Sequence, residues 1–126
     1  MTNKQLVAYA IKAKENSYSP YSKFRVGACL LCEDGSVYTG CNIENVAYGP
    51  SNCAERTAIF KAVSEGNTKF KKIAIAVDGQ NFGYPCGVCR QVMAEFCDNL
   101  DIIVANQDGK FVKTTLKELL PQAFKF

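Results

Sequence analysis

Residues 51–56, SNCAER, and residues 84–90, YPCGVCR, contain three cysteines and a carboxylate in an arrangement typical of a zinc site that activates water. Apolar residues recur at helical spacing after each segment, so both segments are expected to open a helix. Residues three positions apart at the start of a helix lie on one face, which lets Cys86 and Cys89 share one ion with Cys53. We therefore predict that Cys53, Cys86 and Cys89 hold one Zn²⁺ per chain.

Glu55 is the expected catalytic acid and base of this site. A catalytic zinc site keeps an open position beside three protein ligands, whereas a structural site is normally closed by four. Two residues separated by two positions in a regular helix point about 200° apart, so Cys53 is expected at or before the helix cap, in non-helical geometry. The Glu55 carboxylate can then face the ion. Arg56 follows directly and is expected to hydrogen-bond a thiolate, which offsets the negative charge of three sulfurs.

The sequence contains no histidine, which removes the usual general base and every Ser-His-Asp or Cys-His arrangement. Seven cysteines, an odd number, indicate thiolates and metal in a reducing compartment and argue against a disulfide scaffold. The remaining cysteines are interpreted as small apolar residues that are buried or half-buried: Cys29, Cys32, Cys41 and Cys97. Cys29 and Cys32 form a second C-x-x-C pair, but in a strand they point to opposite faces.

Composition indicates one ordinary globular domain over residues 1–126, with 48% hydrophobic and 21% charged residues and a net charge of +3. The one dense basic cluster, Lys69, Lys71 and Lys72, is interpreted as a solvated strand entry and not as a nucleic-acid surface. Neither a signal peptide nor a membrane span of ~20 apolar residues is recognisable. We expect a cytoplasmic protein with no membrane or nucleic-acid partner.

The hydrophobic pattern predicts alternating strands and helices. A capping box, Thr2-x-x-Gln5, starts the first helix, and an Asp34-Gly35 turn joins the first two strands as an antiparallel hairpin. The expected strands are residues 25–32, 37–42, 73–77, 102–105 and 111–114, and the later helices follow residues 53, 86 and 115. Two strands connected through a helix form a parallel crossover. We predict an α/β class, as a three-layer α/β/α fold with a mixed sheet of about five strands.

Residues 53–56 and 85–91 resemble the small, tetrameric type of cytidine deaminase, and their cysteines, glutamate and proline match the zinc deaminase pattern. Residues 21–28, 40–45 and 119–124 resemble that family in order and spacing, so nearly the whole chain is covered. The resemblance implies a zinc-dependent homotetramer. It also implies hydrolytic deamination of cytidine and 2′-deoxycytidine to uridine and 2′-deoxyuridine, with release of ammonia, in pyrimidine salvage.

The resemblance also implies which residues contact the nucleoside. Phe24 becomes a wall of the pocket, although an aromatic residue at this position is more often part of a core. Asn42 and Glu44 become ligands of the ribose 3′-hydroxyl, whereas the residues alone fit turn chemistry equally well. The backbone around Ala54 is expected to hold the polar edge of the pyrimidine. Phe124, near the C-terminus, is expected to reach a neighbouring subunit's site and to stack on the base.

Two other functions fit the same residues. The first is a deaminase for a modified nucleoside or for a base within RNA or DNA, which needs an active site open to a polynucleotide. The second is a structural zinc module in which a fourth cysteine closes the site. Cys97 is the nearest candidate, but it lies eight positions past Cys89, ~12 Å along a helix, which is too far. A third interpretation treats the three zinc-site cysteines as core residues only.

Overall fold

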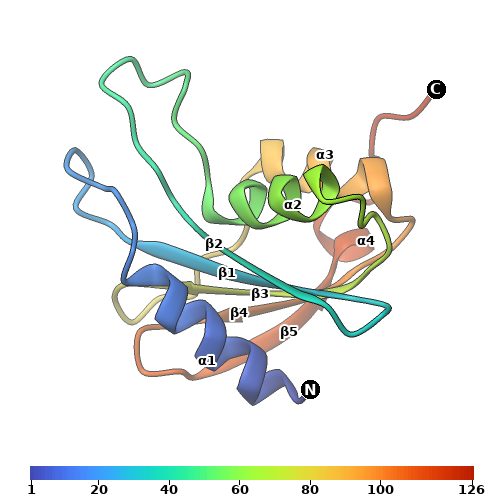
Figure 1. The fold of residues 1–126 in the computed structure, drawn as a ribbon, viewed down its shortest axis with the longest axis horizontal. Helices are drawn as coiled ribbons and strands as arrows, with labels where there is room; N and C mark the ends of the chain where they lie inside the picture. Colours follow the sequence, from blue (N-terminus) through green and yellow to red (C-terminus); the bar gives the residue numbers. More distant parts are fainter.

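A computed structural model describes residues 1–126 and contains four helices and five strands (Figure 1). In chain order the elements are α1 (Asn3–Lys14), β1 (Val26–Cys32), β2 (Val37–Cys41), α2 (Ala54–Ser64), β3 (Phe70–Val77), α3 (Gly87–Phe96), β4 (Asp101–Ala105), β5 (Phe111–Thr115) and α4 (Leu116–Leu119). The strands form one sheet in the order β2-β1-β3-β4-β5. Only β3 and β4 are parallel, and every other neighbouring pair is antiparallel. The predicted mixed sheet is confirmed.

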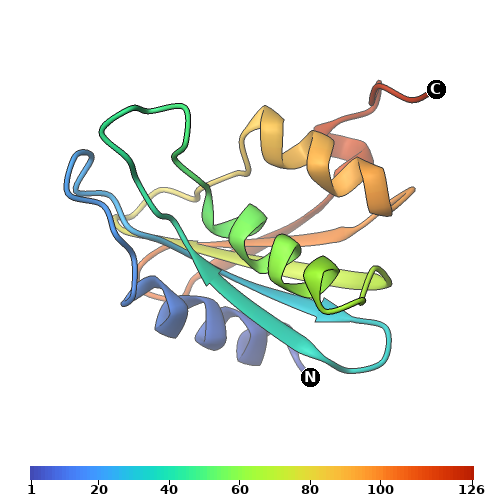
Figure 2. The same cartoon turned by 45° about the horizontal axis from the view of Figure 1, so that its top comes forward.

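The helices cover both faces of the sheet, with α1 on one side and α2, α3 and α4 on the other (Figures 1 and 2). Two apolar cores follow from this arrangement. Cys29 belongs to the core under α1, together with Leu6 and Ala10. Cys32 belongs to the opposite core, which contains Ile59 of α2. The alternation of side chains along β1 separates the two cysteines, as predicted, and the three-layer α/β/α fold is confirmed.

Local signals set most element boundaries. The Oγ1 of Thr2 accepts the N–H of Gln5 at 3.1 Å and the Gln5 side chain accepts the Thr2 N–H at 2.8 Å, which completes the predicted capping box. Strand β3 begins at Phe70, three residues before the predicted start. The difference arises because the lysine-containing entry of β3 pairs with both neighbours, Lys72 being opposite Leu31 on one side and Asp101 on the other.

None of the helices combines the length and apolar composition that crossing a membrane requires.

Gly40 sets the distance between β2 and α2. A Cβ at this residue would lie 2.6 Å from the backbone N of Ala58 and 2.7 Å from the backbone O of Ala54, so only glycine fits. The first turn of α2 therefore lies directly against the backbone of β2. This contact fixes where α2 begins relative to the sheet, and with it the direction of the side chains at its start.

Candidate active site

The predicted cysteines lie at the N-termini of two helices on the same face of the sheet. Cys53 is the N-cap of α2, with φ −74° and ψ 155°, and Cys86 is the N-cap of α3, with φ −67° and ψ 167°. Both residues are therefore extended, and the expectation that Cys53 lies before the helix in non-helical geometry is confirmed. Cys89 is in the first turn of α3 and is buried. The positive ends of two helix dipoles thus face the sulfur atoms.

The three sulfur atoms fit one zinc ion. The Sγ atoms of Cys53, Cys86 and Cys89 all lie within 4.8 Å of one another, and those of Cys53 and Cys86 are 3.8 Å apart. Tetrahedral Zn²⁺ with Zn–S distances of ~2.3 Å places its sulfur ligands ~3.8 Å from each other. No fourth cysteine and no carboxylate belongs to the cluster, and Cys97 lies outside it. Three protein ligands therefore leave a fourth position, as a catalytic site requires and a closed structural site does not.

Charge and hydrogen bonds at the cluster favour a thiolate at Cys53. Nη2 of Arg56 donates a hydrogen bond to the Sγ of Cys53 at 3.2 Å, and the backbone N–H of Cys89 points to the Sγ of Cys86 at 3.5 Å. Contact with Cys89 lowers the pKa of Cys53 to about 5, against the opposing effect of burial, and Arg56 contributes to the lowering. The same contact raises the pKa of Cys89, because the Cys89 thiol keeps its proton as the donor to the Cys53 sulfur, and burial also raises it. Thiolates at these positions are the form that binds metal.

Glu55 is the buried carboxylate of the site. Glu55 is only 4% exposed, although it lies in the first turn of α2 and borders the same cavity as Cys53 and Cys86. Burial, with a smaller contribution from the charge of Cys53, raises the pKa of Glu55 to about 7. A carboxyl group with this pKa can take up and release a proton near neutral pH.

A cavity of about 520 Å³ opens beside the cluster and brings together most of the predicted substrate residues. Its walls include Phe24, Asn42, Glu44 and Ala54, which come from three separate parts of the sequence. Phe24 is 44% exposed and lies on the cavity wall, so its interpretation as a core residue is wrong. The volume is within the range of small-molecule sites.

Asn42 and Glu44 line this cavity while also holding the segment that precedes β1. Nδ2 of Asn42 donates to the carbonyl of Phe24 at 2.9 Å, and its Oδ1 accepts the N–H of Val26 at 2.9 Å. Oε1 of Glu44 accepts the backbone N–H groups of Tyr21 at 3.0 Å and of Ser22 at 3.1 Å. The turn chemistry considered from the sequence is therefore present. The carboxylate oxygens of Glu44 have further lone pairs, so they can also accept hydrogen bonds from a ligand in the cavity.

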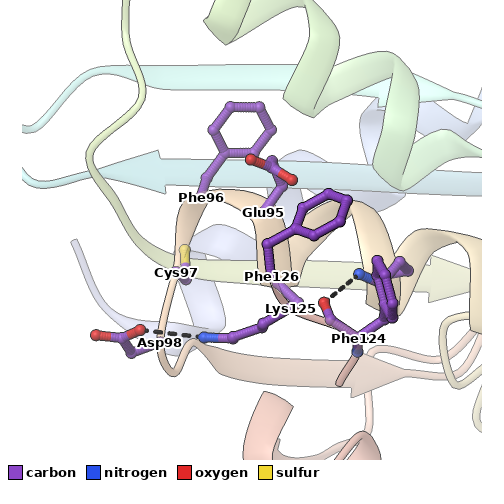
Figure 3. A pocket seen from close by; sticks show the side chains of 9 residues that line it. Glu95, Phe96, Cys97, Asp98, Phe124, Lys125 and Phe126 are labelled. Atoms are coloured by element: carbon purple, nitrogen blue, oxygen red, sulfur yellow. Dashed lines mark hydrogen bonds and ion pairs between the residues drawn. The ribbon is translucent and has the colours of Figure 1, made fainter.

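Phe124 lies away from the cavity of its own chain. It is 69% exposed and borders a different hollow, of about 400 Å³, beside the C-terminal half of α3 (Figure 3). Nε2 of Gln91 donates to the carbonyl of Phe124 at 3.1 Å, and the N–H of Phe124 points back to Oε1 of Gln91 at 3.4 Å. The ring of Phe126 packs edge-on against the Phe124 ring. The expected role of Phe124 concerns a neighbouring subunit and stays a prediction.

Comparison with known proteins agrees with this geometry. Residues 1–105 match the family model described as the cytidine and deoxycytidylate deaminase zinc-binding region. The chain belongs to the cytidine deaminase family. It is 53% identical to the cytidine deaminase of Sporosarcina psychrophila over 125 residues, which are 98% of this chain and 92% of that protein.

Other members of the cytidine deaminase family are similarly close. The cytidine deaminase of Halalkalibacterium halodurans is 50% identical over 125 residues, covering 98% of this chain and 95% of that protein. Among solved structures, the cytidine deaminase of Burkholderia pseudomallei superposes with a TM-score of 0.94 at 44% identity, over 98% of this chain and 100% of that chain. The similarity to these cytidine deaminases therefore extends over nearly the whole chain and not only over the segments that contain the cysteines.

Several wall residues of the cavity were not predicted as such from the sequence, and Val88 and Tyr84 are two of them. Val88 is 56% exposed and borders the cavity. Tyr84 borders the cavity from the loop before α3. Their positions in the sequence could have indicated a place near the site, because Val88 lies between Cys86 and Cys89 and Tyr84 directly precedes Pro85.

Proposed function

We propose that this chain catalyses the hydrolytic deamination of cytidine and 2′-deoxycytidine to uridine and 2′-deoxyuridine, with release of ammonia, as a step of pyrimidine salvage. The observation that carries the proposal is the three-sulfur cluster of Cys53, Cys86 and Cys89 with the buried carboxylate of Glu55 on the same cavity. The names and the overall similarity of the relatives support the choice of a nucleoside as substrate.

Cys53, Cys86 and Cys89 would hold one Zn²⁺ per subunit. Zinc in such a site lowers the pKa of a bound water toward 7 and so supplies the nucleophile for hydrolysis. Arg56 would keep the sulfurs ionised, since its guanidinium already donates to the Sγ of Cys53.

Glu55 would move both protons of the reaction. It takes the first proton from the water and delivers it to ring N3, which makes C4 electrophilic as the water oxygen bonds to it. It takes the second proton from the new hydroxyl group and delivers it to the amino group. The C4–N bond then breaks, ammonia leaves, and C4 keeps the oxygen as the carbonyl of uridine. One carboxylate suffices because it is regenerated in its starting form at each turnover.

The cavity walls would select the nucleoside. Asn42 and Glu44 are proposed to bind the ribose 3′-hydroxyl, and the backbone around Ala54 the polar edge of the pyrimidine, while Phe24 forms an apolar wall. Their location on the same cavity as Glu55 supports these roles. A cavity of about 520 Å³ suits one nucleoside. Coverage of the base by Phe124 of a neighbouring subunit would leave little room for a polynucleotide, so free cytidine is favoured over a base within RNA or DNA.

We further propose that the protein is a homotetramer in which Phe124 of one subunit stacks on the base in a neighbouring site. The strong exposure of Phe124 and its distance from its own cavity support this arrangement. The cytosol is the proposed location, because the metal site requires reduced cysteines and a reducing compartment preserves them.

The decisive experiment combines zinc analysis with an absorbance assay for the conversion of cytidine to uridine, with and without chelator. We expect zinc near one equivalent per chain and turnover that chelation abolishes. Glu55→Gln should retain zinc and lose turnover by about 10²-fold to 10⁴-fold or more, since the amide cannot carry protons. Full activity of this variant would refute the role of Glu55. Zinc without turnover on free nucleosides would refute the proposed activity, and single-stranded oligonucleotides then test the other deaminase class.

A further inference from the structure

Residues 24–26 carry the cavity wall residue Phe24 and are held from both sides by side chains outside β1. On one side Asn42 bonds the carbonyl of Phe24 and the N–H of Val26. On the other side Asp78, the first residue after β3, bonds both backbone groups of Arg25. Oδ2 of Asp78 accepts the Arg25 N–H at 3.0 Å, and the Asp78 N–H donates to the Arg25 carbonyl at 3.1 Å. The position of the Phe24 backbone therefore depends on two anchors.

Asp78 also pairs with two cations. Nε of Arg25 lies 3.0 Å from Oδ2 of Asp78, and Nη2 of Arg25 lies 3.1 Å from Oδ1, so the guanidinium contacts the carboxylate at two points. Nζ of Lys14, in the last turn of α1, lies 2.9 Å from Oδ1, and the Lys14 side chain is only 7% exposed. An arginine that bonds a carboxylate through two nitrogens is fixed in direction as well as in charge. Asp78 thus joins α1, the end of β3 and the segment before β1.

Lys23 shows why this segment needs anchors. Its φ of +58° is in the left-handed region, which is unfavourable for a residue with a side chain. Such a conformation persists only where the surrounding contacts impose it. Glu44 fixes the residues before Lys23, through Ser22 and its neighbour, and Asp78 fixes Arg25 after it. Release of either anchor would let the segment relax and shift Phe24.

We infer that Asp78 is a positioning residue for substrate binding: acting through Arg25, it holds Phe24 in place on the cavity wall. Asp78 does not itself border the cavity. Its contacts leave α2 and α3 untouched, and these two helices carry Glu55 and the cysteines. Loss of Asp78 therefore weakens nucleoside binding and leaves the metal and the proton transfers intact. This inference rests on the proposed activity toward cytidine.

The test measures KM and kcat for cytidine, the inhibition constant of the product uridine, and zinc content in wild type and in Asp78→Asn. We expect KM and the uridine inhibition constant to rise together by about tenfold, because a small misplacement of a contact residue costs this much or more. We expect kcat within about twofold of wild type and unchanged zinc. Asp108→Asn is the matched control, since its carboxylate is exposed, lies in a turn and forms no ion pair; its KM should equal that of wild type.

Arg25→Met is the second variant, because it keeps the pair of Lys14 with Asp78 and the exposed Arg25 side chain is dispensable for the core. Its KM should rise by about threefold, and it decides the matter if Asp78→Asn does not fold.

Unchanged KM in a folded variant overturns the inference, and so does a fall of kcat together with zinc content, which indicates a general structural defect. A wild type that binds zinc but does not deaminate cytidine overturns the proposed function, and the inference with it. An active wild type with an unaffected variant overturns the inference alone.

Discussion

Nη2 of Arg56 lies 3.2 Å from the Sγ of Cys53 and donates a hydrogen bond to it. The Nε of the same guanidinium is buried and has no hydrogen-bond partner. A fixed positive charge next to thiolates withdraws negative charge from the metal site. Arg56, which follows Glu55 in the sequence, thereby takes part in the electrostatics of the same centre.

Replacement of this arginine tests that relationship. Arg56→Gln should lower kcat or zinc affinity by about 10-fold to 100-fold, the usual effect of removing a group that supports a metal ligand. Zinc transfer to a chromophoric chelator and steady-state kinetics measure the two quantities. Arg56→Lys is the matched comparison, and it should recover only part of the loss because an ammonium lacks the planar set of donors. Wild-type values of both quantities in Arg56→Gln would contradict this role.

Removal of one cysteine separates metal ligands from packing cysteines. Cys86→Ala should lose nearly all zinc and all turnover, since Cys86 contributes one of only three sulfurs. Cys97→Ala should keep both, because Cys97 is half-buried and lies outside the cluster. Chelator should lower the melting temperature of the wild type and of Cys97→Ala but not that of Cys86→Ala, since bound metal stabilises the folded state by mass action. Equal zinc content in the two variants would exclude the proposed ligand set.

Mixed assemblies test the proposed contribution of Phe124 to a neighbouring site. Phe124→Ala should raise the KM for cytidine about tenfold or more, because stacking of an aromatic side chain on a base is worth ~1–3 kcal/mol. Glu55→Gln chains are expected to be inactive but carry an intact Phe124. Assembled with Phe124→Ala chains, they should restore a component with wild-type KM.

The control for this experiment mixes Phe124→Ala with a chain that carries both Glu55→Gln and Phe124→Ala. No low-KM component should form, because neither chain then supplies the aromatic ring. If the first mixture co-assembles and still shows only the high KM, Phe124 does not act across a subunit boundary.

The acid stability of the protein should report the Asp78 ion pairs. The hydrogen bond from Arg25, together with Lys14, holds the pKa of Asp78 well below its ordinary value. A carboxylate with a depressed folded-state pKa contributes stability that is fully present above its ordinary pKa of about 4 and is lost as the pH falls toward the folded-state pKa. The unfolding free energy of Asp78→Asn should therefore lie below that of wild type at about pH 6, and the difference should shrink toward about pH 2.5.

Urea unfolding at a series of pH values measures this difference. Asp108→Asn should follow the wild-type curve at every pH, because the Asp108 side chain is exposed in a turn and forms no ion pair. Metal release in acid should change the unfolding free energy of all three proteins equally, so it does not affect the differences between them. A difference between wild type and Asp78→Asn that does not change with pH would mean that Asp78 stabilises the fold without its charge.

The parts of the molecule that could be predicted from the sequence are those that depend on near neighbours in the chain. The capping box of Thr2 and Gln5, the hairpin turn at residues 34–35 and the extended geometry of Cys53 before α2 all follow from spacing and residue type. The convergence of Cys53 with the α3 cysteines was also predicted, because three cysteines at two helix starts with a carboxylate beside one of them are typical of a zinc site that activates water.

Tertiary structure decided what no spacing could reveal. Lys14, Arg25 and Asp78 lie far apart in the sequence and follow no pattern, and only the antiparallel pairing of β1 with β3 brings Arg25 beside Asp78. The outward place of Phe124 depends likewise on how the C-terminal segment runs along α3. Local propensities fix caps, turns and helical faces because these involve residues within one turn of each other. Ion pairs and cavity walls are fixed by packing between elements, since that packing alone sets which distant side chains share a space.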